Sequence, residues 1–254
     1  MPKPHWLVTF VVFSASSACI AADEWGDLKL RFSYDGEPPK PRLMKVAPDR
    51  LVPDESLIVE PKDLGIANVC VWLSTEDGAS PPVHPDSAVA GNDKFAGTIR
   101  DGRFSPHIMI VRPPQGFLVR NHDHVGYDTN VEFSRNGSLS STLKPDATFA
   151  VFLDREEDYP ARLTCSIHPS LSGYVLVRST PYSLVSDESG KVSFENLPVG
   201  KWTFVVWHER AGFVKQAARA GKVVEWPRGR ATLEIKPGEN DLGEIKLSPE
   251  LFAR

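Results

Sequence analysis

The stretch Thr164-Cys165-Ser166-Ile167-His168-Pro169 places a thiol and an imidazole three residues apart, at the end of a run that alternates polar and apolar residues. Thiolate sulfur and imidazole nitrogen are ligands that copper and related transition metals favour. The stretch holds a single cysteine, which excludes the two-cysteine signature of c-type haem attachment. It therefore predicts half of a metal site, carried on a loop between predicted strands at 162–166 and 174–178.

Outward from this loop, helical periodicity is scarce and short alternating or β-branched runs are separated by Gly, Pro, Asp and Asn. Residues 28–32 alternate cleanly, 69–73 form a compact apolar run, and the Pro- and Gly-rich segment 74–93 predicts a connection. Further strands are predicted at 107–111, 117–120, 130–133, 148–153, 191–195, 201–207, 222–226, 231–235 and 244–247. This spacing predicts an all-β chain of sandwiches, and 254 residues suffice for more than one domain.

Two resemblances divide the chain. Trp25-Gly26-Asp27-Leu28 with Tyr34-Asp35-Gly36-Glu37-Pro38-Pro39 resembles the first strand and turn of a carboxypeptidase regulatory-like, or transthyretin-like, sandwich. The segments 68–73 and 187–202 resemble later parts of the same sandwich, whereas the stretch between them resembles a cupredoxin. The resemblance implies a cupredoxin-like Greek-key sandwich nested in or next to a transthyretin-like β-sandwich. Its implied parts are 25–76 and 180–247 for the regulatory-like sandwich and 95–178 for the cupredoxin-like domain.

The central part is most similar to exported cupredoxin-like proteins of a methylamine-utilisation-like family, which also share endings like Lys236-Pro237-Gly238-Glu239-Asn240-Asp241. That resemblance implies copper held by Cys165, His168 and an earlier histidine. Here Tyr127, in Gly126-Tyr127-Asp128, stands where the family has this histidine, and Leu171 stands where it often has methionine. An axial methionine is a weak ligand, but a phenol with a pKa near 10 replaces an imidazole poorly.

Other residues could supply the missing ligand of the metal site, or could remove its thiolate by forming a disulfide. His107, His122 and His124 lie in or near the hairpin that precedes the missing ligand, and His107 and His124 are the additional metal-ligand candidates. The alternative for each is an exposed loop histidine. Cys70 could form a disulfide with Cys165 in an oxidising compartment, or it could be a buried strand residue beside a free thiolate. A relic site that binds no metal is the third interpretation.

The N-terminus predicts export. Lys3, the apolar run 6–13 and the small residues ending at Ala22 are typical of a signal peptide spanning residues 1–22. The run is too short for a membrane span of about 20 residues, although an uncleaved anchor is the alternative. Cys19 raises the possibility of a lipoprotein, but Ser16 stands where a lipobox carries a large aliphatic residue. Plain cleavage and a periplasmic or extracellular location are therefore favoured.

Charge and motifs exclude several function classes. The formal net charge is −4, which gives no reason to expect a nucleic-acid partner. The chain has no nucleophile-elbow motif, phosphate-binding glycine loop or dinucleotide fingerprint, so we expect no enzyme. Trp207-His208-Glu209 lacks the second histidine of a zinc-protease motif and predicts only a strand end facing solvent or another loop.

Two functions remain. The first is a secreted copper-binding protein acting in electron transfer or copper handling, with a redox or copper-donor protein as partner, and the altered ligand set favours handling. The second is a non-catalytic binding or structural module for a carbohydrate or a protein. Trp202, Trp207 and Trp226 could stack on sugars, although aromatic residues on strands more often lie in the core.

Overall fold

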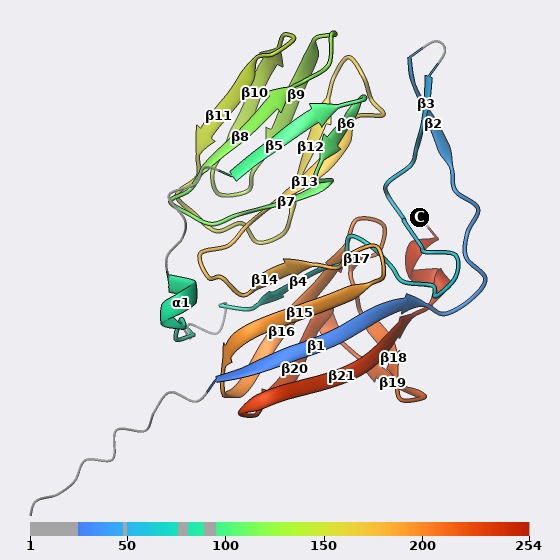
Figure 1. The fold of residues 1–254 in the computed structure, drawn as a ribbon, viewed down its shortest axis with the longest axis vertical. Coiled ribbons are helices and arrows are strands. Elements are labelled where there is room, and N and C mark those ends of the chain that lie inside the picture. Colours follow the sequence, from blue (N-terminus) through green and yellow to red (C-terminus); the bar gives the residue numbers. More distant parts are fainter. Residues whose placement is uncertain (1–24, 48–49, 76–80, 89–94, 254) are drawn as a thin grey trace, which may run out of the picture.

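The computed structural model describes residues 25–47, 50–75, 81–88 and 95–253, and there the chain is nearly all β, which confirms the predicted fold class. The predicted signal peptide and Cys19 lie outside the described residues. Figure 1 shows two β-sandwiches stacked on each other, with a hairpin rising beside the upper one. We call the upper unit the central sandwich and the lower one the flanking sandwich.

The flanking sandwich is built from both ends of the described chain. Its first sheet has the order β15 (Lys191–Pro198), β1 (Trp25–Tyr34), β21 (Gly238–Leu247), β18 (Gln216–Arg219) and β19 (Lys222–Glu225). Its second sheet has the order β14 (Ser183–Val185), β4 (Cys70–Leu73), β16 (Gly200–His208) and β17 (Gly212–Phe213), with β20 (Arg230–Ile235) also paired to β16.

The pairing of the earliest strands shows how the chain is threaded. Strand β1 runs antiparallel to β15, with Leu28 opposite Phe194, and parallel to β21, with Phe32 opposite Ile245. Strand β4 pairs with β14 and β16. The chain therefore leaves the flanking sandwich after β4 and returns to it at β14, after the whole central sandwich.

The central sandwich also has two sheets. One has the order β10 (Ser138–Leu143), β9 (Tyr127–Glu132), β12 (Ala161–Cys165), β13 (Ser172–Val177) and β7 (Ile108–Val111). The other has the order β11 (Thr148–Phe152), β8 (Gly116–Asn121), β5 (Phe95–Arg100) and β6 (Arg103–Ser105). Strands β5 and β8 pair in parallel, as do β7 and β13, whereas the other pairs are antiparallel.

The two sandwiches share a third core between them. Because side chains alternate across a strand, Val71 of β4 faces the flanking core while Trp72 faces the central sandwich. The same alternation on β13 sends Val175 into the central core and Leu176 into the shared one. The members of the shared core are Cys70, Trp72, Ile108, Tyr174, Leu176, Val205 and Trp207. The four sheets therefore form one continuous stack (Figure 1).

A hairpin that the sequence reading did not predict comes from the segment between β1 and β4. Strands β2 (Leu43–Ala47) and β3 (Arg50–Pro53) rise beside the edge of the central sandwich (Figure 1). The remaining elements are short: α1 (Pro85–Ala88), η1 (Pro227–Gly229) and η2 (Pro249–Phe252). No helix within the described ranges has the length and apolar character that a membrane crossing requires.

Candidate functional site

The thiol and imidazole of the predicted metal site meet at the end of β12. Cys165 is the last residue of that strand, and its Sγ lies 3.7 Å from Nδ1 of His168. The backbone N–H groups of Asp128 and His168 donate to the same sulfur at 3.3 and 3.4 Å. Cys165 is buried, and the two amides hold its sulfur beside the imidazole.

Local structure explains why the loop presents this pair. Cys165 pairs across the sheet with Thr129 of β9, which fixes the sulfur beside the start of that strand. The chain then turns, and the N–H of Leu171 donates to the carbonyl oxygen of His168 at 2.9 Å. Leu171 is buried in the central core, so it anchors the far side of the loop and offers no ligand atom.

Tyr127, the first residue of β9, does not direct a free oxygen at this pair. Its ring lies 5.0 Å from the His168 ring between centroids, but its hydroxyl donates to Oδ2 of Asp123 at 2.7 Å. Burial, reinforced by the hydrogen bond and negative charge of Asp123, raises the pKa of Tyr127 well above its ordinary value. The phenol therefore remains protonated, and its O–H group is used in the hydrogen bond to the Asp123 carboxylate.

Asp123 is itself held by the neighbouring turn. Its carboxylate accepts the backbone N–H groups of Asp101 and Gly102 at 2.7 and 2.8 Å. Burial alone would raise its pKa, but these amides, the Tyr127 hydroxyl and the charge of Arg50 lower it overall. Asp123 is thus a charged acceptor that orients Tyr127, and the sequence reading did not single it out.

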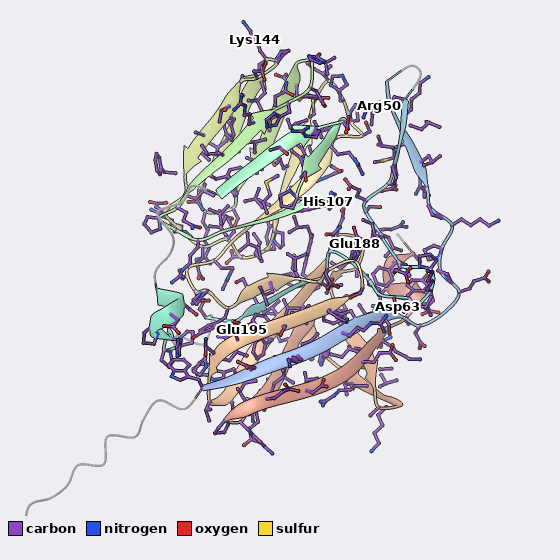
Figure 2. The ribbon with its side chains drawn as sticks, viewed as in Figure 1. Arg50, Asp63, His107, Lys144, Glu188 and Glu195 are labelled. Carbon is purple, nitrogen blue, oxygen red and sulfur yellow. The ribbon has the colours of Figure 1, made fainter. Side chains whose placement is uncertain are left out.

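A cavity of about 670 Å³ opens beside this group. It is lined by Tyr127, His168, His122 and His124 from the central sandwich, and by Val46 and Arg50 from the β2–β3 hairpin. Arg50 forms an ion pair with Asp101 at 2.6 Å, which ties the hairpin to the central sandwich (Figure 2). The turn-forming pair Pro48-Asp49 between two short apolar-rich runs is the sequence signal that could have predicted this hairpin.

His107 is engaged elsewhere. It lies between the two sandwiches (Figure 2), where its Nε2 is 2.7 Å from Oε2 of Glu209 and its Nδ1 is 3.7 Å from Oε2 of Glu55. Both ring nitrogens face carboxylates, so the structure does not bring His107 to Cys165. Glu209 was expected to face solvent or another loop; it faces the loop of His107, whereas His208 is fully buried.

His122 and His124 border the cavity without completing a ligand set. Within the described ranges, no group of three or more His, Cys, Asp and Glu side chains is arranged to hold a metal ion. The exposed ring of His124 and the half-buried ring of His122 are consistent with loop histidines.

The sequence resemblance implies copper, and the donor atoms around Cys165 decide whether that metal fits. Thiolate and imidazole bonds to a metal are about 2.3 and 2.0 Å long, so one ion could contact both Cys165 and His168 across 3.7 Å. A near-trigonal blue copper site needs a second imidazole. Neither Tyr127 nor His107 supplies it, because each is bound to a carboxylate. The residues fit a two-ligand, open copper site and do not fit a complete blue copper site.

The disulfide alternative is not formed. Cys70 and Cys165 are both free cysteines. Cys70 lies on β4 in the core shared by the sandwiches, whereas Cys165 lies in the core of the central sandwich. Burial raises the pKa of the Cys70 thiol far above its ordinary value, so Cys70 is an inert packing residue.

Trp207 and Trp226 are buried, and Nε1 of the half-buried Trp202 donates to the carbonyl oxygen of Pro198 at 2.7 Å. These tryptophans belong to the packing of the sandwich, as strand aromatics usually do. They do not form an exposed platform for sugars.

No protein-family model and no curated protein matches the chain. Similar solved structures include a reduced amicyanin mutant at 14% identity, which covers 42% of this chain and 98% of its own with a TM-score of 0.31. A purple cupredoxin from Nitrosopumilus maritimus has 18% identity, 34% and 100% coverage and a TM-score of 0.29. A copper-containing nitrite reductase from Thermus scotoductus SA-01 has 14% identity, 39% and 25% coverage and a TM-score of 0.32. Identities and TM-scores this low carry no argument about function. Any function must therefore be argued from the geometry of this chain.

Proposed function

We propose that this chain is an exported, non-catalytic copper-binding protein in which Cys165 and His168 hold the ion in an open site, for copper handling rather than electron transfer. The observation that carries the proposal is the 3.7 Å separation of Sγ and Nδ1, with the sulfur fixed by two backbone amides. Hydrogen bonds to a ligand atom orient it and tune its metal affinity.

The surroundings of the pair favour handling over electron transfer. An electron-transfer site keeps its ligand set through both oxidation states, whereas a handling site must release its metal. Here Tyr127 stands where a second imidazole would be needed, and the site borders a cavity of about 670 Å³. An ion held by two protein ligands retains room for a ligand from a copper-donor or copper-acceptor protein.

The first test is a copper(I) titration of the reduced protein against a chromophoric chelator under anaerobic conditions. We expect one copper(I) per chain, and we expect Cys165→Ser to weaken binding by at least about 100-fold, because it removes a ligand atom rather than a group that only hydrogen-bonds to a ligand. His168→Phe should also weaken it. Cys70→Ala is the matched thiol control and should leave the affinity unchanged.

Two outcomes would count against the proposal. One is copper(I) affinity that survives Cys165→Ser, and the other is affinity lost equally in Cys70→Ala. An intense thiolate-to-copper(II) absorption band in the native protein would instead favour the electron-transfer alternative.

A further inference from the structure

The flanking sandwich contains a second cavity, of about 470 Å³, between its two sheets. Buried core side chains form its floor, with Phe32 and Ile245 from the first sheet and Phe204 from the second. Trp226, which precedes η1, lines it as well. The cavity shares no lining residue with the one beside His168, so it is a separate feature of the molecule.

The sides of this cavity are apolar but incompletely covered. Val224 of β19, Leu233 of β20 and Leu242 of β21 pack against the flanking core while remaining partly exposed. Among the strands that the structure describes, β20 pairs only with β16 and β19 only with β18, so both are edge strands and the two sheets are not joined there. A concave apolar site with a few polar groups at its rim is the usual form of a small-molecule site.

One rim residue gives the site a preferred charge. Arg219 lines the cavity and is half-buried, and its Nε donates to the carbonyl oxygen of Leu242 at 3.1 Å, which orients the guanidinium. Within the ranges that the structure describes, no carboxylate lies within ion-pair distance of Arg219. A guanidinium fixed in this way can bind a carboxylate through charge-assisted hydrogen bonds, which are stronger beside an apolar wall than in water.

The other polar lining residues restrict the ligand further. Glu225 also lines the cavity and is exposed, so a ligand with a second negative group would meet like charge there. Thr232 contributes a hydroxyl from β20, and Arg230 a second guanidinium that already has a partner. This set suits one carboxylate attached to an apolar body, rather than a phosphate or a sugar.

We propose that this cavity binds a small amphipathic monocarboxylate, of the size of a medium-chain fatty acid. Its apolar body lies between the two sheets over Phe204 and Ile245, and its carboxylate lies on Arg219. The proposal does not depend on copper binding, because the cavity and the Cys165–His168 pair lie in different sandwiches.

The test is isothermal titration of the full mature chain at neutral pH with decanoate, 1-decanol and decyltrimethylammonium, each below its micelle concentration. We expect decanoate to bind one per chain and at least about 10-fold more tightly than decanol, with no measurable binding of the cation. Arg219→Met should lower the decanoate affinity to that of decanol. Lys222→Met, which removes a nearby exposed charge that does not line the cavity, is the matched control and should have no effect.

Leu233→Trp fills the cavity from its partly exposed side and should abolish binding of both decanoate and decanol. Thermal unfolding of each variant checks that it is folded. If Leu233→Trp is unfolded, the comparison of Arg219→Met with Lys222→Met still tests the proposal. The proposal is overturned if decanoate does not bind, if decanol or the cation binds as tightly, or if Arg219→Met and Lys222→Met give the same affinity.

Discussion

At the scale of single residues, Tyr127 stands where the candidate site would need a second imidazole. Its ring lies 5.0 Å from that of His168, yet its hydroxyl is bound to Asp123. The position is therefore close enough to take part in the site, and the side chain is of the wrong chemical type. Placing an imidazole at position 127 should therefore change the chemistry of the candidate site.

We expect Tyr127→His to create a third strong ligand beside Cys165 and His168, because a thiolate with two imidazoles is the equatorial set of a blue copper site. Loaded with copper(II), this variant should show an intense thiolate-to-copper absorption band that the native protein lacks. Tyr127→Phe is the control, since it removes the hydroxyl without adding an imidazole. Identical spectra for the two variants would show that position 127 does not reach the metal.

His208 is a second residue with a specific consequence. Its side chain is fully buried, and burial, followed by the charges of His107 and Arg210, lowers its pKa to about 3. In the unfolded chain the pKa returns to about 6.5. Between these values the unfolded state binds more protons, so the free energy of unfolding falls as the pH drops below 6.5.

We therefore expect the native protein to lose about 2 kcal/mol of stability between pH 7 and pH 5 through His208. His208→Leu removes the titration, and its stability should change less over the same range. Urea unfolding at the two pH values measures the difference. His124→Leu, at an exposed histidine, should retain the native pH dependence; if His208→Leu retains it too, another group is responsible.

At the scale of elements, loops of the central sandwich are held by buried charge as well as by strand pairing. Glu157, in the connection between β11 and β12, is only 1% exposed. Its carboxylate accepts the backbone N–H groups of Ser134, Arg135 and Asn136, which form the turn between β9 and β10. Burial alone would raise the pKa of Glu157, but the hydrogen bonds from Ser134, Asn136 and Arg135 outweigh it and lower the pKa.

Glu157→Gln should lower the free energy of unfolding by about 2 kcal/mol near neutral pH, because it removes the charge that strengthens several buried hydrogen bonds. The contribution is present above the ordinary carboxyl pKa and is lost as the pH falls through the lowered one. The stability difference between native and variant should therefore shrink on acidification below about pH 4. Asp158→Asn, which breaks only an exposed pair with Arg135, should cost less than about 1 kcal/mol. Equal costs for the two substitutions would contradict this account of Glu157.

At the scale of the whole molecule, the two sandwiches are joined by a buried apolar layer and by a charged cluster at its margin. Tyr174 of β13 packs edge-on against Trp207 of β16, with ring centroids 5.0 Å apart. Beside them His107 lies against Glu209, which follows β16 of the flanking sandwich, and against Glu55, which follows β3 of the hairpin. Burial and the charge of Glu209 raise the pKa of Tyr174 to about 12, so this phenol stays neutral at the contact.

His107→Ala should cost about 2 kcal/mol, because it removes the 2.7 Å hydrogen bond to the largely covered Glu209 carboxylate. The double variant His107→Ala with Glu209→Ala should cost less than the sum of the single variants, since no uncompensated charge is left. Chemical unfolding of the native protein, the two single variants and the double variant gives the coupling free energy between the two side chains. Additive costs would show that the two side chains do not stabilise the contact jointly.

Much of the fold was predictable from local sequence. Alternation along 28–32 and compact apolar runs such as 69–73 predict strands, because a strand exposes its two faces with a period of two residues. The runs at β4 and at residues 204–207 are apolar on both faces, since one face lies in the flanking core and the other in the shared core. The hairpin at 43–53 was missed because its short strands carry exposed residues and only a weak pattern.

By itself, the sequence determined the all-β class and the Cys165–His168 pair. The class follows from the local pattern within each short run, and the pair consists of residues that are neighbours along one strand and its loop. Tertiary structure alone decided the rest of the site. It bound Tyr127 to Asp123, turned His107 toward Glu209 and set the hairpin beside the cavity, since each contact joins segments that only packing brings together. The cavity at Arg219 has the same origin: its walls come from strands that are distant in sequence and meet only when two sheets pack.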